Sequence, residues 1–265
     1  MIQLQEFSRR RLRRVRAVFT DIDDTLTTGG CLTAEAYTAM SDLQAAGVDV
    51  VPVTGRPAGW CDLIARLWPV RGVVGENGAF YFQYDRALKR MNRFYADAER
   101  LRADKREKLA AIGKIIVSEV PGSAISADQQ YRETDLAIDF AEDVSRLSDA
   151  AISRIVKFFK SGGATAKVSS IHVNGWIGQY DKLTMTRIFV VDCLNKDLEK
   201  HNDEFVFIGD SPNDAPMFEF FNNSVGVANV QTLKGRLSNK PKYVTRSEGG
   251  AGFAEVARAL IGSRS

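Results

Sequence analysis

The stretch Val18-Phe19-Thr20-Asp21-Ile22-Asp23-Asp24-Thr25-Leu26 decides the fold, because an apolar run ends there in closely spaced carboxylates. Successive residues of a strand point to opposite faces, but a chain that turns as it leaves the strand can direct Asp21 and Asp23 into one crevice. Open α/β sheets bind ligands in such a crevice, beyond the carboxyl ends of their strands. One carboxylate could there attack an electrophile while the other handles a proton. Taken alone, the stretch is explained equally well by an Asp-rich turn that closes the strand.

Three further polar clusters lie after apolar runs or at the start of a helical pattern. Residues 50–53 lead into Thr54-Gly55-Arg56-Pro57, and residues 204–208 lead into Gly209-Asp210-Ser211-Pro212-Asn213-Asp214. Lys182 opens a helical pattern. Each cluster alone has an ordinary explanation: a threonine in a turn, an aspartate that caps a helix, or a lysine on a helix surface. The four together, in this order and at strand ends, are hard to explain as independent coincidences.

In order and type, these clusters resemble the four motifs of the haloacid dehalogenase superfamily of phosphatases. Those motifs are D-x-D-x-T, a Thr or Ser after the second strand, a Lys, and G-D-x-x-N-D. The matching residues extend from Asp21 to Asp214 and so cover most of the chain. Asp24 departs from the pattern, because many relatives carry glycine there, and this departure could alter the local turn.

The resemblance implies that Asp21 attacks phosphorus to form an aspartyl-phosphate, and that Asp23 serves as general acid and then as general base. A phosphate dianion repels an anionic nucleophile, so the implied cofactor is Mg²⁺, which prefers oxygen ligands. The implied metal ligands are one oxygen of Asp21, the backbone carbonyl of Asp23 and the Asp210 carboxylate, with Asn213 or Asp214 ordering the waters and Thr25 supporting the loop. The implied phosphate ligands are Lys182, the Thr54 hydroxyl and backbone N–H groups near Ile22, Asp23 and Gly55.

Strands and helices alternate at both ends of the sequence, which predicts a Rossmann-like, doubly wound parallel sheet in an α/β fold. The predicted core comprises residues 1–84 and 181–265. Its predicted strands are 15–22, 48–53, 72–74, 205–208, 225–227 and 243–244, and its predicted helices are 34–46, 58–68, 183–194, 215–221, 230–237 and 251–261. Gly75-Glu76-Asn77-Gly78 followed by an apolar run predicts a hairpin.

The pattern changes over residues 85–180, which predicts an inserted α+β domain. Helices are expected over 97–117 and 149–160, and strands over 135–140, 165–168 and 171–173. The insertion resembles the class-two, subtype B cap of the same superfamily, found in Cof-type and sucrose-phosphate-type phosphatases, and Glu76-Asn77-Gly78-Ala79 resembles that subgroup as well. A plain hairpin turn also accounts for Asn77-Gly78.

In capped relatives the cap contacts the leaving group, so substrate contacts are expected among polar residues of the insertion and its surroundings. The candidates are Arg56, Asn77, Lys167, Ser169, Ser170, His172 and Asn174. The segment 169–176 mixes hydroxyls, an imidazole, an amide and an aromatic ring, which would suit a sugar. A solvent-facing strand edge explains the same residues equally well. Arg56 could bind a second anionic group or pair with a core carboxylate.

The composition excludes several other classes of protein. The chain has 265 residues, of which 45% are hydrophobic, and no apolar run approaches the roughly 18 residues of a membrane span. Residues 1–16 lack the apolar region of a secretory signal, so we expect a cytoplasmic protein. Cys31, Cys61 and Cys193 are expected to be reduced core thiols rather than a disulfide framework. The run Arg9-Arg10-Arg11-Leu12-Arg13-Arg14-Val15-Arg16 could bind anions but more often is a solvated arm, and nothing else favours a nucleic-acid partner.

The sequence therefore predicts a Mg²⁺-dependent phosphomonoester hydrolase whose partner is a small, sugar-like phosphorylated metabolite. A phosphomutase of the phosphomannomutase type is the alternative enzyme, although only Arg56 and Lys167 suggest a second phosphate site. A sugar-phosphate-binding regulator without turnover is the alternative from another class. The oligomeric state is left open.

Overall fold

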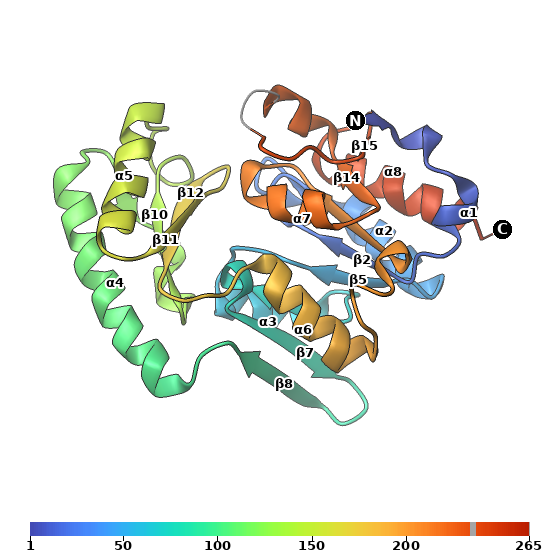
Figure 1. The fold of residues 1–265 in the computed structure, drawn as a ribbon, viewed down its shortest axis with the longest axis horizontal. Helices are drawn as coiled ribbons and strands as arrows, with labels where there is room; N and C mark the ends of the chain where they lie inside the picture. The colour runs from blue at the N-terminus through green and yellow to red at the C-terminus, as the bar shows by residue number, and fades with distance from the viewer. Residues whose placement is uncertain (234–236, 265) are drawn as a thin grey trace.

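The computed structural model describes residues 1–233 and 237–264, and its centre is a parallel sheet (Figure 1). The six strands follow the order β1-β15-β14-β13-β2-β5, and every pair is parallel. Their bounds are β1 (Ile2–Gln3), β15 (Tyr243–Val244), β14 (Ser224–Gly226), β13 (Phe205–Gly209), β2 (Ala17–Thr20) and β5 (Asp49–Pro52). Parallel strands are normally covered on both faces, and here β2 and β13 are entirely buried. The predicted doubly wound sheet is confirmed.

Helices cover the two faces of this sheet, and the side chains of the strands alternate between them. Val18 and Val206 belong to one apolar cluster, and Phe19 and Phe207 belong to the other. The first cluster lies under α2 (Ala34–Ala45), α3 (Ala58–Leu67) and α8 (Gly249–Gly262); the second lies under α6 (Lys182–Leu194) and α7 (Ala215–Phe220). The two-residue period of the strands therefore produces two apolar layers, as a three-layer α/β fold requires.

The arginine-rich N-terminal segment, expected to be a solvated arm, is folded against the core while most of its charges stay in solvent. Strand β1 pairs with β15. Along the chain, β1 is followed by η1 (Leu4–Glu6) and α1 (Arg9–Leu12). Phe7 stacks on Tyr243 with ring centroids 4.2 Å apart, and Leu12 is buried. Most of the arginine side chains still face solvent. The apolar residues between the arginines anchor the segment and leave the charges hydrated.

A second, antiparallel sheet adjoins the parallel one through a parallel bridge between Val53 and Val74. It has the order β6-β7-β8, with bounds β6 (Val73–Gly75), β7 (Phe80–Asp85) and β8 (Arg90–Tyr95). The turn between β6 and β7 is η2 (Glu76–Gly78), so the hairpin predicted there is present. Position 85, where the insertion was expected to begin, is the last residue of β7, and β8 still pairs with this core hairpin.

The inserted segment forms its own α+β layer, drawn in green to yellow in Figure 1. Its antiparallel sheet has the order β11-β12-β10-β9, with bounds β11 (Thr165–Val168), β12 (His172–Trp176), β10 (Asp135–Asp139) and β9 (Ala124–Ile125). Helices α4 (Glu99–Glu119) and α5 (Asp149–Ser161) pack on one face over Leu136, Ile138 and Val173. Side chains of alternate parity, including Asp135, His172 and Asn174, therefore lie on the opposite face.

Short elements complete the described part of the chain. They are β3 (Thr27–Thr28), β4 (Cys31–Leu32), η3 (Ala127–Tyr131), η4 (Asn202–Glu204), η5 (Pro212–Asp214) and η6 (Ala228–Leu233). The helix predicted over 230–237 corresponds to η6, and residues 234–236 lie outside the described residues. Cys61 and Cys193 are buried free thiols, but Cys31 is exposed, contrary to the expectation of a core thiol. Among the described residues, no helix combines the length and apolarity needed to cross a membrane.

Candidate active site

The polar clusters predicted from the sequence meet at the carboxyl edge of the parallel sheet. Asp21, Thr54 and Asp210 follow β2, β5 and β13, which are adjacent in the order β13-β2-β5. Backbone hydrogen bonds tie the strand ends together: the Asp21 N–H donates to the Ile208 carbonyl at 2.9 Å. The first residue of α6 is Lys182, and the side chain of Asp181 caps that helix by accepting from the Thr184 N–H at 2.7 Å. The sheet order thus brings together residues that lie up to about 190 positions apart.

Lys182 is buried between two of the carboxylates. Its Nζ lies 2.7 Å from Asp21 Oδ1 and 2.9 Å from Asp214 Oδ1. Burial alone would lower the pKa of Lys182, but the two carboxylates outweigh it and raise that pKa, so the ammonium stays charged. Burial also raises the pKa of Asp21 to about 7, against the lowering effect of Lys182. The single positive charge of Lys182 therefore neutralises the negative charges of Asp21 and Asp214 only in part.

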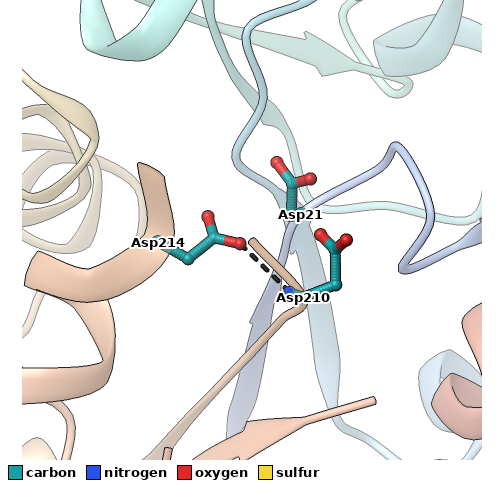
Figure 2. Close-up of side chains that lie close together, drawn as sticks. All are labelled: Asp21, Asp210 and Asp214. Atoms are coloured by element: carbon teal, nitrogen blue, oxygen red, sulfur yellow. Dashed lines mark hydrogen bonds between the residues drawn. The ribbon is translucent and has the colours of Figure 1, made fainter. Parts of the chain in front are cut away.

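Asp21, Asp210 and Asp214 form an acidic cluster at the end of the sheet (Figure 2). One oxygen from each carboxylate lies within 4.8 Å of the others. Asp214 also holds the loop, because its Oδ2 accepts from the backbone N–H groups of Asp210 at 3.2 Å and Ser211 at 3.3 Å. Burial and the neighbouring carboxylates of Asp214 and Asp21 raise the pKa of Asp210 well above its ordinary value. Three buried carboxylates with too little positive charge around them fit a hard divalent cation with oxygen ligands.

Two side chains orient Asp210 within this cluster. The Thr25 hydroxyl donates to Asp210 Oδ1 at 3.3 Å, and Asn229 Nδ2 lies 3.4 Å from Asp210 Oδ2. Asn229 also donates to the Asp24 carbonyl at 2.8 Å. The sequence pattern did not reveal Asn229, which comes from the short helix η6, beyond the recognised motifs. Asp24 itself has a φ of 55°, a left-handed conformation that favours glycine and that aspartate tolerates better than most residues.

Asp23 is held by Arg56. The guanidinium Nε lies 3.0 and 3.1 Å from the two carboxylate oxygens of Asp23, and Nη2 lies 2.8 Å from Oδ1. The same guanidinium binds Glu142 Oε1 at 2.9 Å and lies 4.4 Å from the centre of the Trp60 ring. Arg56 was expected either to bind a second anionic group or to pair with a core carboxylate, and in the structure it pairs with the carboxylate of Asp23. Glu142, in the loop after β10, is a functional candidate that sequence reasoning missed.

The loop after β5 contains Thr54 and Gly55, next to the residues described above. The Thr54 hydroxyl accepts from the Arg56 N–H at 3.0 Å, so its own proton can be donated to a ligand. A Cβ on Gly55 would lie 3.0 Å from Asn77 Nδ2, which is tighter than an ordinary contact. Glycine at this position therefore lets the turn η2 pack closely on this loop.

The insertion closes over these groups and leaves a cavity of about 10 Å³. The lining residues come from both parts of the chain: Asp21, Asp23, Gly55, Arg56, Arg132, Ser169, Ser170, Ile171, His172, Asn174, Ser211 and Asn213. His172 is only 3% exposed and Asn174 only 4%. Strand β12 lies between β11 and β10, so the alternative of a solvent-facing strand edge is wrong.

Two of the polar candidates in the insertion, His172 and Asn174, are bound to carboxylates. His172 Nε2 lies 2.9 Å from Glu142 Oε2, and Asn174 Nδ2 donates to Asp135 Oδ2 at 3.0 Å. The contact with His172, together with the Arg56 guanidinium, lowers the pKa of Glu142 to about 2. These side chains thus enter the cavity as members of a charged network rather than as isolated contacts.

Arg132 links this network to the core and was not foreseen from the sequence. Its guanidinium donates to both oxygens of Asp128 at 3.0 and 3.1 Å and to Asp135 Oδ1 at 3.0 Å. It also donates to the Gly55 carbonyl at 2.9 Å. A single arginine in a charged segment carries no motif, so only the packing of the insertion on the core reveals it.

A second cavity of about 60 Å³ is lined by Lys182. Its lining includes the predicted residues Asn77, Lys167, Lys182 and Asn213, together with Trp176. Lys167 is exposed, while Asn77 and Lys182 are buried. Four predicted residues line neither cavity: Thr54 hydrogen-bonds to Arg56, Asp214 binds Lys182, and Thr25 and Asp210 hydrogen-bond to each other.

Comparisons with known proteins agree with this arrangement. Residues 185–256 match the model of a family described as haloacid dehalogenase-like hydrolase. No curated protein matches the chain.

Solved structures share the fold at low sequence identity. The C-terminal domain of trehalose-6-phosphate phosphatase from C. albicans has a TM-score of 0.71 at 14% identity, covering 98% of this chain and 97% of that one. The sucrose-phosphatase of Synechocystis, in complex with sucrose and phosphate, has a TM-score of 0.63 at 14% identity, covering 94% and 98%. A sugar phosphatase of subclass IIB of the HAD superfamily has a TM-score of 0.63 at 15% identity, covering 94% and 100%. Residues 185–256 therefore match the haloacid dehalogenase-like hydrolase family, and the solved structures show that the fold is shared along almost the whole length of the chain.

Proposed function

We propose that the protein is a Mg²⁺-dependent phosphatase that hydrolyses a small, sugar-like phosphate monoester through an aspartyl-phosphate on Asp21. The observation that carries the proposal is the setting of Asp21. Lys182 binds one oxygen of Asp21 at 2.7 Å. Asp23 lines the same cavity as Asp21 and is hydrogen-bonded to Arg56. A nucleophile and an acid in one small cavity, each with its own cation, are what a two-step phosphoryl transfer requires.

The first step is attack by Asp21. With Oδ1 bound to Lys182, the other carboxylate oxygen is available to bond to phosphorus. Lys182, the Thr54 hydroxyl and backbone N–H groups of the loops after β2 and β5 would bind the non-bridging oxygens, over which the transition-state charge is spread. A Mg²⁺ ion held by Asp21 and Asp210, with the Asp23 carbonyl, would reduce the repulsion between the phosphate dianion and this carboxylate.

Asp23 handles the protons of both steps. It would protonate the leaving oxygen as the ester bond breaks, and it would then take a proton from the water that cleaves the aspartyl-phosphate. Arg56 fixes the direction of this carboxylate by contacting both of its oxygens. Because Arg56 also binds Glu142, the geometry of the acid depends on the insertion being closed.

We further propose that the insertion, residues 85–180, acts as a substrate-selecting cap over a core of residues 1–84 and 181–265, although β8 remains paired with the core. The polar face of its sheet supports this role, since His172 and Asn174 line the cavity that contains Asp21. Hydroxyl-rich sugars match a lining of amide, imidazole and hydroxyl groups. The proteins of similar fold named above are phosphatases of sugar phosphates, which favours the same substrate class.

The alternative functions have less support. A phosphomutase needs a second phosphate site, but Arg56 is already engaged by Asp23 and Glu142, and Lys167 is exposed. A regulator that only binds sugar phosphates needs neither Asp23 as an acid nor Arg56 to hold it. The free thiols Cys61 and Cys193 support a reducing, cytoplasmic setting as part of this proposal.

A screen of phosphorylated metabolites tests the function. The protein is incubated with Mg²⁺ and each compound, and released inorganic phosphate is measured. We expect release from hexose or disaccharide phosphates and none from the Asp21→Asn variant. Conversion of a sugar 1-phosphate to its 6-phosphate without phosphate release would favour the mutase, and binding without either reaction would favour the regulator.

A further inference from the structure

The side chain of Asn77 is buried without a hydrogen-bond partner for its amide nitrogen. Asn77 is 4% exposed, and its Nδ2 is one of three buried side-chain atoms among the described residues that have no partner in the structure. An N–H group that is removed from water and left unpaired costs about 1–3 kcal/mol. An orphaned donor of this kind inside a candidate site indicates a ligand that the protein alone does not supply.

The surroundings of Asn77 show where such a ligand would lie. Its backbone N–H donates to the Thr54 carbonyl at 3.0 Å, and its side-chain amide packs against Gly55. On the other side, a Cβ on Gly78 would lie 2.0 Å from the Asp181 carbonyl, so η2 also touches the start of α6, next to Lys182. The turn therefore sits between the loop and the lysine assigned to the phosphoryl oxygens, and Asn77 lines a cavity with Lys182 and Asn213.

The turn itself does not require an asparagine. Asn77 has a φ of 56°, a left-handed conformation that glycine adopts at no steric cost. Glycine would therefore form a plain hairpin turn at least as well as asparagine, and it would also avoid burying an amide. The presence of an unpaired amide at this position calls for a role in binding.

We propose that Asn77 is a phosphate-binding residue whose Nδ2 donates a hydrogen bond to a non-bridging oxygen of the phosphoryl group. This inference rests on the proposed function and deepens it, because it adds a neutral donor to the set formed by Lys182, Thr54 and the backbone N–H groups. The three non-bridging oxygens of a phosphoryl group offer more acceptor positions than one lysine and one hydroxyl can fill. Because the contact is made to the phosphoryl group, it serves every substrate equally.

The test is direct binding of inorganic phosphate in the presence of Mg²⁺, measured by titration calorimetry on the full-length protein. Asn77→Gly keeps the left-handed backbone and removes only the amide. We expect its affinity for phosphate to fall about tenfold to hundredfold, the effect of losing a hydrogen bond to a charged group. Asn195→Gly is the matched control: Asn195 has a φ of 52°, is exposed and lies at the opposite end of α6 from Lys182. That variant should bind phosphate as the wild type does.

Asn77→Asp provides a second variant of nearly the same size, which remains informative if the glycine variant does not fold. It replaces the donor with a carboxylate facing the anion, so its phosphate affinity should fall at least as far. Phosphate affinities of folded Asn77 variants within about twofold of the wild type would overturn the inference, as would a wild-type protein that does not bind phosphate. A wild type that binds phosphate but hydrolyses no ester would refute the proposed function alone, and the comparison with Asn77→Gly would still decide the role of the amide.

Discussion

Arg56 of the core and Glu142 of the insertion form an ion pair with an N–O distance of 2.9 Å, and the same guanidinium holds Asp23. The pair joins the two parts of the chain next to the candidate acid. Glu142 is in turn bound to His172 at 2.9 Å. The contact between the insertion and the core and the orientation of Asp23 therefore depend on the same guanidinium, and each can be perturbed through the other.

Glu142→Gln should weaken substrate binding more than it slows the reaction. It keeps the size of the side chain but removes the charge that attracts Arg56, so the closed arrangement should be less populated and KM should rise about threefold to tenfold. Steady-state kinetics on the sugar phosphate found by the screen measure this effect. Glu119→Gln is the control, since Glu119 pairs with Arg154 on the exposed surface of the insertion. An unchanged KM in Glu142→Gln would mean that the ion pair does not govern closure.

Glu76 should be a major contributor to stability. It lies in η2, and its carboxylate accepts from the backbone N–H groups of Ala58, Glu133, Thr134 and Asp135 at 2.6–3.1 Å, and from the Thr134 hydroxyl. Burial raises the pKa of Glu76 to about 7, but every one of these contacts requires it as an acceptor.

Glu76→Gln replaces one acceptor oxygen with an NH₂ group that faces other donors. We expect the free energy of unfolding to fall by about 2–4 kcal/mol, because buried N–H groups are left unpaired. Urea denaturation measures the change, and exposed Glu119→Gln should stay within about 1 kcal/mol of the wild type. Equal stabilities of the two variants would show that Glu76 does not anchor the insertion to the core.

Substitutions in the insertion should distinguish substrates, and substitutions in the core should not. His172→Ala or Asn174→Ala should lower kcat/KM for the sugar phosphate, with a loss of transition-state stabilisation of about 1–3 kcal/mol. The same variants should barely affect p-nitrophenyl phosphate, whose leaving group makes few contacts with the cap. Lys182→Ala should impair both substrates, because both present the same phosphoryl group. Similar losses on both substrates for the His172 and Asn174 variants would assign these residues to closure or stability.

Metal removal should abolish activity reversibly. Chelation by EDTA should stop phosphate release, and added Mg²⁺ should restore it, since Asp21 and Asp210 are buried acids in need of a cation. Ca²⁺ should support the reaction poorly, because its larger and looser coordination shell would misplace phosphorus relative to Asp21. Full activity in EDTA would contradict the proposed chemistry.

The core of the fold and the motif residues could be predicted because both have local signals. Apolar runs of strand length ending in Asp21, Thr54 and Asp210 predicted parallel strands, and parallel strands bring their carboxyl ends to one edge. The structure confirms the sheet and places these residues together. Lys182 could be placed only through the resemblance, since a lysine at the start of a helix has no distinctive pattern.

The contacts between the insertion and the core could not be predicted. Arg132 and Glu142 stand in charged segments without periodicity, and their roles arise only when the polar face of the inserted sheet meets the loop around Gly55. The packing of the N-terminal segment was missed for a similar reason. Its arginines dominate the composition, whereas Phe7 and Leu12, which anchor it, are too few to form a pattern.

Nucleophilic attack by Asp21 is the central claim, and the chemical state of this residue during turnover tests it most directly. In Asp23→Asn, breakdown of the aspartyl-phosphate should be slow, because the residue that activates water is lost. That variant is mixed with p-nitrophenyl phosphate and Mg²⁺, quenched in acid and digested, and the peptides are analysed by mass spectrometry. The account predicts phosphate on the peptide that contains Asp21, and none when Asp21→Asn is added to the same variant. Phosphate on another residue, or a wild-type rate of hydrolysis in Asp21→Asn alone, would contradict it.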